Sequence, residues 1–129
     1  MAILPDGARD LFDAVNFATV TSLNADGGPH ASVVWARTDG DDILFSTLRG
    51  RRKDVNFRRD PRTAIVAFDH ADPYRYAEVR GRVVLTDDPE GALIEEMSRK
   101  YTGKAWVEAD PQARRVIVRI VPEHVFYRG

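Results

Sequence analysis

The chain is constrained above all by a succession of short β-forming segments separated by turn signals. Residues 17–23, Phe-Ala-Thr-Val-Thr-Ser-Leu, combine β-branched and aromatic side chains and lead into Asn-Ala-Asp-Gly-Gly, which is typical of a hairpin turn. A return strand is predicted over 30–37, and a second turn, Thr-Asp-Gly-Asp-Asp, leads into a third strand over 43–47. Three strands joined by turns this short predict an antiparallel meander.

Further strands are predicted over 63–68 and 76–85, and Gly81 inside the second indicates a bulge or a bend in a barrel. Residues 115–127 predict one last strand, or a strand pair, that Pro122 breaks or ends. Six or seven antiparallel strands must hide both sheet edges and one face. We therefore expect a mainly β fold that closes into a small barrel or sandwich.

Three short helices accompany the strands. The spacing of apolar residues predicts a helix over 6–15, and the basic segment predicts one over 48–58, for which Ser46 or Thr47 could supply the N-cap. Asp88 followed by proline predicts the start of a third helix, whose apolar residues are Leu93, Ile94, Met97 and Tyr101. Residues 102–112 show no readable pattern.

Composition excludes several kinds of site. The chain has no cysteine, which excludes disulfides, thiolate zinc sites and cysteine nucleophiles, and its three histidines are isolated, so we expect no metal site. Neither a Gly-x-Gly-x-x-Gly motif nor a Walker loop occurs. With 129 residues, no repeat, no linker and no signal or membrane segment, we expect one domain over 1–129 in a cytoplasmic protein that does not bind membranes.

Charge is concentrated in one segment. Seven basic and two acidic residues lie between 49 and 62, which gives this segment a charge of +5. Because the net charge of the chain is −1, the remaining residues carry −6. Such a segment favours a compact anionic ligand, whereas the small net negative charge argues against nucleic acid as a partner. The alternative interpretation is a solvated helix face.

A phosphate is the anion that this segment suits best. The strand ends in the hydroxyls of Ser46 and Thr47, and Arg51 and Lys53 follow in the predicted helix. Arg52 shares a helix face with Asn56, and both are candidate binding residues. The last arginines of the segment, Arg58, Arg59 and Arg62, are assigned to structure or surface.

The order and spacing of these motifs resemble the split β-barrel flavin- and deazaflavin-binding proteins related to pyridoxamine 5'-phosphate oxidase, in particular their short members that use coenzyme F420. The resemblance covers nearly the whole chain. It rests on the segment 17–23, Asp26-Gly-Gly-Pro-His, Phe45-Ser-Thr, the basic segment from Arg51 to Arg62, Tyr76-Ala-Glu-Val-Arg-Gly and Pro122-Glu-His-Val-Phe. It implies a six- to seven-stranded antiparallel split β-barrel.

The resemblance also implies a homodimer with two cofactor sites at the subunit interface. It assigns Arg51 and Lys53 to the cofactor phosphate, and Ser46 and Thr47 to its ribityl and phosphate region. The strand through Ser32, Val34 and Trp35 would lie beside the tricyclic ring, and Tyr74 and Tyr76 would reach the cofactor from the other subunit. Open barrel faces bearing Val34, Trp35 and Phe126 are expected to need cover by that subunit.

The function implied is an F420-dependent reductase that transfers a hydride from the reduced deazaflavin to a small conjugated or electron-poor organic substrate. An FMN-binding oxidoreductase of the same fold is one alternative, and a non-catalytic protein that binds F420 or a tetrapyrrole is another. Cations beyond the phosphate pair, such as Arg49 and Arg52, favour F420, because its polyglutamate tail adds negative charge whereas FMN ends at its phosphate.

Overall fold

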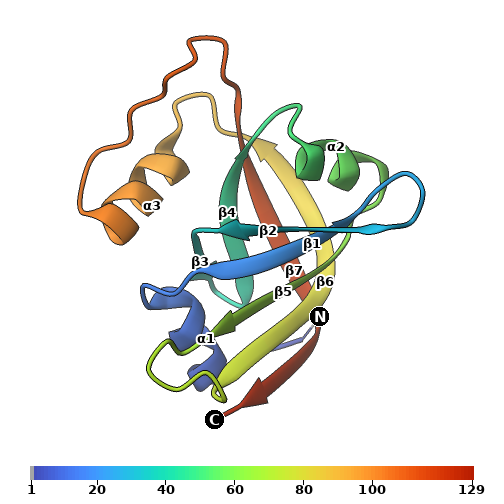
Figure 1. Cartoon of the computed structure of the whole chain (residues 1–129), viewed down its shortest axis with the longest axis vertical. Coiled ribbons are helices and arrows are strands. Elements are labelled where there is room, and N and C mark those ends of the chain that lie inside the picture. Colours follow the sequence, from blue (N-terminus) through green and yellow to red (C-terminus); the bar gives the residue numbers. More distant parts are fainter. Residues whose placement is uncertain (1) are drawn as a thin grey trace.

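A computed structural model describes residues 2–129, which form one antiparallel sheet of seven strands together with three helices (Figure 1). The mainly β prediction is confirmed. The helices are α1 (Asp6–Asp13), α2 (Arg52–Arg59) and α3 (Ala92–Thr102). The strands are β1 (Ala18–Leu23), β2 (Pro29–Val34), β3 (Ala36–Asp39), β4 (Asp42–Leu48), β5 (Arg62–Phe68), β6 (Tyr76–Asp87) and β7 (Arg115–Arg128).

The sheet curls into a split barrel, and its strand order shows why. The order is β2-β1-β5-β6-β7-β4-β3, so β2 and β3 lie at opposite ends of the sheet although only Trp35 separates them in the chain. One residue can join both edges of a sheet only if the sheet curves until the edges meet. The strand expected over 30–37 is therefore two strands. Both predicted hairpins form, because β1 pairs with β2 and β3 pairs with β4, but they lie at opposite ends of the sheet order and do not make one continuous meander.

The barrel interior is filled by the inward side of each strand. Burial alternates along β1 and β5, as a period of two requires, and places Val20 and Ile65 among the core side chains. α1 packs against β3 and buries Leu11 and Phe12 in the same core. α2 packs against β1, whereas α3 covers the outside of β4 and forms a second cluster around Met97 (Figure 1).

A β-bulge interrupts the pairing of β6 with β7 at Gly81, where the sequence indicated a bulge or a bend. The register shifts between Arg80 and Gly81, and Gly81 faces Pro122. A Cβ on Gly81 would lie 2.1 Å from the Val121 carbonyl oxygen, so only glycine permits this approach of the two backbones. The prediction that Pro122 breaks or ends the last strand is wrong, because β7 continues through it to Arg128. Pro122 has no N–H to donate, and the bulge interrupts the hydrogen bonds between β6 and β7 at this residue.

All three helices differ from their predicted bounds. α1 ends at Asp13, and Val15, expected on its apolar face, is exposed. α3 begins at Ala92 and not at Pro89, but Asp88 still caps it: its carboxylate accepts hydrogen bonds from the backbone N–H groups of Ala92 at 3.1 Å and Leu93 at 2.9 Å.

α2 begins four residues later than predicted, because β4 continues to Leu48. Neither Ser46 nor Thr47 caps it, so that prediction is wrong. The backbone N–H of Gly50 instead donates to the buried carboxylate of Asp54 at 2.8 Å. The hydroxyls of Ser46 and Thr47 make no hydrogen bond within residues 2–129.

None of the helices within residues 2–129 is long and apolar enough to cross a membrane.

The crossover at Trp35 is fixed by the end of α3. The Tyr101 ring stacks on Trp35 with centroids 5.4 Å apart, and its hydroxyl donates to the Asn16 carbonyl at 2.7 Å and accepts from the Ala36 N–H at 3.1 Å. The Lys100 ammonium donates to the Ala36 carbonyl at 2.6 Å. Both backbone groups of the residue after Trp35 are thus bound by α3.

We expect Tyr101→Phe to lower the free energy of unfolding by about 2 kcal/mol, because it leaves a largely buried donor and acceptor without their partner. Tyr74→Phe is the matched control, since Tyr74 is exposed and its loss of a hydroxyl should change stability little. Urea unfolding monitored by circular dichroism measures both. Equal effects of the two substitutions would contradict this role of Tyr101.

Candidate functional site

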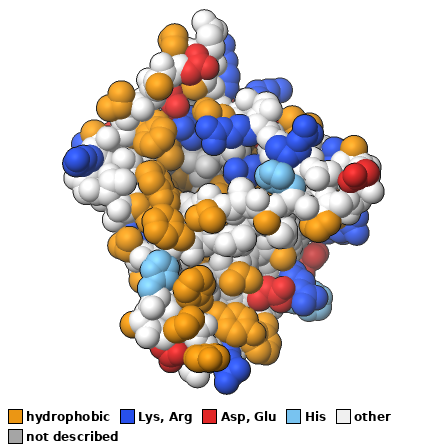
Figure 2. Space-filling view, in the orientation of Figure 1, with side chains coloured by type: hydrophobic (Ala, Val, Ile, Leu, Met, Phe, Trp, Pro, Cys, Tyr) orange, Lys and Arg blue, Asp and Glu red, His pale blue; other side chains and the backbone are white. Residues whose placement is uncertain are grey.

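A pocket of about 180 Å³ lies where β4 ends and α2 begins, with β2 and α3 as further walls. Figure 2 shows basic side chains around this hollow. Six of the predicted site residues line it, namely Val34, Trp35, Ser46, Thr47, Arg51 and Lys53. The remaining lining residues are Val33, Ile94, Trp106 and Arg115.

Three consecutive cations occupy the start of α2. Arg51 is the N-cap residue, and Arg52 and Lys53 are the first two residues of the helix. The N-terminus of a helix carries partial positive charge, so cations there oppose helix stability. None of the three side chains has a carboxylate within ion-pairing distance in the described part of the chain. This arrangement is unfavourable for folding and favourable for binding an anion.

Lys53 is the most constrained of these cations. Its side chain is half-buried at the pocket wall, and burial, followed by the nearby charge of Arg51, holds the pKa of its ammonium below the usual value. An anion in the pocket would reverse both effects by restoring a counter-charge.

Unpartnered hydroxyls face the same pocket. Ser46 Oγ and Thr47 Oγ1 are buried and have no hydrogen-bond partner within residues 2–129. Ser32 Oγ on β2 is also buried and unpartnered in the described part of the chain, but Ser32, a predicted site residue, does not line the pocket. Buried polar atoms are rarely left unpaired in folded proteins. Ser46 and Thr47 therefore hold hydrogen-bonding capacity for a ligand beside Lys53.

Aromatic rings form the other wall. Trp35 presents its ring between Tyr101 and Trp106, with Trp106 edge-on at a centroid distance of 6.1 Å and an interplanar angle of 89°. The pocket thus pairs an apolar wall with a cationic, hydroxyl-bearing end. This combination suits a planar aromatic ligand that carries a phosphate.

Sequence reasoning missed Trp106 and Arg115. Trp106 lies in the segment without a readable pattern, and Arg115 is the first residue of β7. The guanidinium of Arg115 lies over the Trp106 ring, 5.0 Å from its centroid. A tryptophan in an otherwise hydrophilic loop was the one signal that could have drawn attention to this segment.

A family model described as pyridoxamine 5'-phosphate oxidase matches residues 4–129. The chain belongs to this family.

Solved structures agree with the family assignment. A protein named F420 reductase is 29% identical, with a TM-score of 0.86 over 95% of this chain and 98% of its own. The conserved hypothetical protein Rv2991 of Mycobacterium tuberculosis is 25% identical, with a TM-score of 0.77 over 97% and 84%. General Stress Protein 26 of Bacillus anthracis, at 15% identity and a TM-score of 0.72 over 95% and 91%, shares the fold. No curated protein sequence gives a significant match.

Two predicted residues of α2 lie outside the pocket of this family member. Asn56 is fully buried, and its amide donates to Ser22 Oγ at 2.9 Å and to Asn24 Oδ1 at 3.0 Å, which ties α2 to the β1–β2 hairpin. Arg52 points instead toward a shallow hollow at that hairpin. Within one chain, neither residue lines the pocket beside Lys53.

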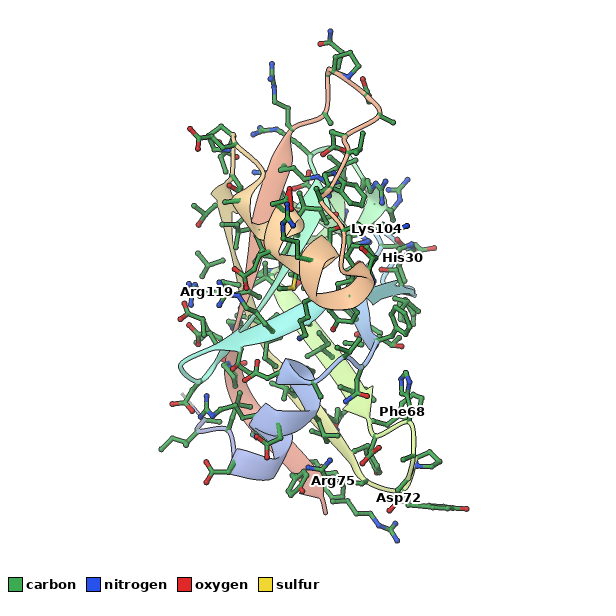
Figure 3. The ribbon with its side chains drawn as sticks, turned by 90° about the vertical axis from the view of Figure 1, so that its left-hand side faces the viewer. His30, Phe68, Asp72, Arg75, Lys104 and Arg119 are labelled. Atoms are coloured by element: carbon green, nitrogen blue, oxygen red, sulfur yellow. The ribbon has the colours of Figure 1, made fainter. Side chains whose placement is uncertain are left out.

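Tyr74 and Tyr76 also lie away from the pocket. Figure 3 shows Asp72 and Arg75, on either side of Tyr74 in the chain, at one end of the molecule and well away from His30 and Lys104. Tyr74 is exposed, and Tyr76 packs against Phe126 with centroids 5.5 Å apart. Within one chain neither tyrosine reaches the site.

The last arginines of the basic segment make structural contacts, as predicted. Arg58 binds the buried Asp54 at 3.0 Å, and Arg59 donates to the Leu23 carbonyl. Arg62 binds Asp60 at 2.7 Å, and its hydrogen bond lowers the pKa of that carboxyl to about 2.

We expect Lys53→Met to raise the free energy of unfolding at neutral pH, because it removes a partly desolvated charge beside Arg51 and a helix N-terminus. The penalty is fully present at neutral pH and is relieved as the pH rises through the lowered pKa of Lys53, so the gain should shrink at alkaline pH. Lys104→Met, at an exposed lysine, is the control. Urea unfolding at pH 7 and pH 10 measures this, and a loss of stability in Lys53→Met at pH 7 would contradict it.

Proposed function

We propose that the protein is an oxidoreductase that binds coenzyme F420 in this pocket and uses its reduced form to reduce a small conjugated or electron-poor organic molecule. The observation that carries the proposal is the group of Lys53, Arg51 and two unpartnered hydroxyls at one end of an aromatic-walled pocket. Membership of the pyridoxamine 5'-phosphate oxidase family and the likeness to an F420 reductase over nearly the whole of both chains support it.

The residues present fit such a cofactor. Lys53 and Arg51 would hold the phosphate, with Arg51 able to donate two parallel hydrogen bonds and Lys53 acting as a point charge. Ser46 and Thr47 would donate to the phosphate or to the polyol next to it. Trp35 would bound the ring system and exclude water from one side. When bound in its reduced form, F420 supplies the hydride.

F420 is preferred over FMN because cations continue beyond the phosphate position. Arg49, Arg114 and Arg115 line an adjoining hollow of about 320 Å³. In the free chain Arg115 pairs with Glu108, and Arg49 pairs with Asp87, which lines the same hollow. FMN ends at its phosphate and would not reach these arginines, whereas the polyglutamate tail of F420 extends past the phosphate with further carboxylates.

A second copy of the chain would complete the site. The pocket is smaller than the roughly 300–1,000 Å³ of typical cofactor sites. Val33, which lines the pocket, is 64% exposed, and Phe17 and Phe68 are exposed as well. Figure 2 shows that hydrophobic side chains are exposed on the face that it draws. Val34, expected on an open face, is buried in the core instead. We infer that these exposed side chains contact a partner, which brings its Tyr74 and Tyr76 toward the cofactor.

We expect the purified protein to bind F420 more tightly than FMN, and Lys53→Met to weaken F420 binding by about tenfold to a hundredfold, the scale of a charge-assisted hydrogen bond. Trp35 and Trp106 are the two tryptophans of the chain and both line the pocket, so their fluorescence reports binding directly. Lys104→Met is the matched control and should bind normally.

Tighter binding of FMN would move the function to flavin chemistry on the same site. Binding of neither ligand by folded protein would contradict the proposal. Binding without reduction of any electron-poor acceptor would indicate a carrier protein.

We expect light scattering to give twice the 14.5 kDa mass of one chain, because the exposed apolar side chains and the small pocket both need a partner. A chain mass that stays at 14.5 kDa with F420 bound would contradict an interfacial site.

A further inference from the structure

A carboxylate holds the arginine that borders the pocket. Glu108 receives two hydrogen bonds from Arg115, one from Nε at 2.8 Å and one from a terminal guanidinium nitrogen at 3.0 Å. The indole N–H of Trp106 donates to the same carboxylate at 3.1 Å. The Arg115 side chain is only 9% exposed in this arrangement, whereas that of Glu108 is 31% exposed. Arg115 is therefore fixed between a ring and an anion.

Arg115 has a special place among the hollows of this face. It is the one residue within 2–129 that lines the pocket beside Lys53, the hollow beside Glu108 and the hollow with Arg49 and Arg114. A ligand that extends from the first hollow into the third would therefore pass beside Arg115. The charge that such a ligand meets there is neutralised by Glu108.

Glu108 acts on the site beyond this single contact. Its pKa is held below the usual value first by the hydrogen bond from Arg115 and also by the charges of Arg115 and Arg51, so the carboxylate is ionised at neutral pH. The same attraction lowers the positive potential that Arg51 and Arg115 offer to an anionic ligand. The Glu108 carboxylate is thus a built-in competitor for the ligand.

We propose that Glu108 and Arg115 determine ligand specificity: an anionic group beyond the phosphate binds Arg115 only by displacing the Glu108 carboxylate. A ligand that ends at its phosphate leaves the pair intact. One that carries further carboxylates or phosphates exchanges one ion pair for another, and Arg115 turns from Glu108 to the ligand. The inference rests on the proposed function for the identity of the ligand, and on the arginine cluster for its charge.

We expect Glu108→Gln to fold, because Glu108 is part of no helix or strand. It lies between α3 and β7 in a segment without helix or strand, and its contacts are those to Arg115 and Trp106. If Glu108 only held the loop in place, its neutralisation would weaken ligand binding, because the loop would loosen around the pocket. If Glu108 competes with the ligand for Arg115, its neutralisation would strengthen ligand binding.

The test is a titration of the folded protein and of Glu108→Gln with F420, FMN, inorganic tripolyphosphate and inorganic phosphate, followed by tryptophan fluorescence. We expect Glu108→Gln to bind F420 and tripolyphosphate about fivefold more tightly, the scale of one unit-charge interaction at about 4 Å in water, with FMN and phosphate changed less than about twofold. The gain should shrink as salt is added.

Two variants control for charge and for the partner. Glu123→Gln removes the same charge from another arginine pair, with Arg82, away from the pocket and should change nothing. Compared with Arg115→Gln alone, the double variant Glu108→Gln/Arg115→Gln should lose most of the gain, because this double-mutant cycle isolates the interaction between the two residues.

Unchanged or weaker binding of both F420 and tripolyphosphate by Glu108→Gln would overturn the inference, as would an equal gain in Glu123→Gln. If the wild type binds neither F420 nor FMN while Glu108→Gln still gains affinity for tripolyphosphate, the proposed cofactor is wrong and the competition stands.

Discussion

The structure depends on the crossover at Trp35, where the chain passes from one edge of the sheet to the other in a single residue. This constraint curls the sheet and places β2, the end of β4 and α3 around one hollow. Tyr101 and Lys100 secure it by binding both backbone groups of Ala36. The closure of the barrel and one wall of the pocket therefore depend on the same residue, Trp35.

The second determinant is the placement of charge. α2 begins with three cations where the helix dipole favours anions, and the one carboxylate of that turn, Asp54, is used to cap Gly50 and bind Arg58. Positive charge is thus left at the pocket beside two buried hydroxyls without partners. Such an arrangement lowers the free energy of unfolding of the free protein. An anion that binds there raises it again.

Local patterns predicted most of the elements. Alternation of apolar residues has a period of two in a half-buried strand, so the strands were recognisable, and Gly81 indicated its bulge because glycine permits the approach of Val121. Pairing was harder, because the separation of β2 from β3 is decided by contacts of Trp35 with α3, which lie far apart in the chain. The bulge also explains why Pro122 continues a strand that it was expected to end.

The pocket residues that lie close together in the sequence could be predicted from it. Those that the fold brings together from distant segments could not. Ser46, Thr47, Arg51 and Lys53 follow one another at a strand-to-helix junction and line the pocket together. Asn56 shares their segment but faces the core, since helix positions differ in direction. Trp106 lies in a loop without periodicity, and Arg115 begins the strand that follows this loop, so no local pattern predicted that either would line the pocket.

The central claim is that the end of β4 and the start of α2 bind the phosphate of a flavin-like cofactor. A crystal structure of the protein with F420 tests it most directly. The account predicts phosphate oxygens within hydrogen-bonding distance, about 3 Å, of Lys53 Nζ and Thr47 Oγ1, with the ring system beside Trp35. A cofactor bound elsewhere on the barrel, with Lys53 and Thr47 still unpartnered, would contradict it.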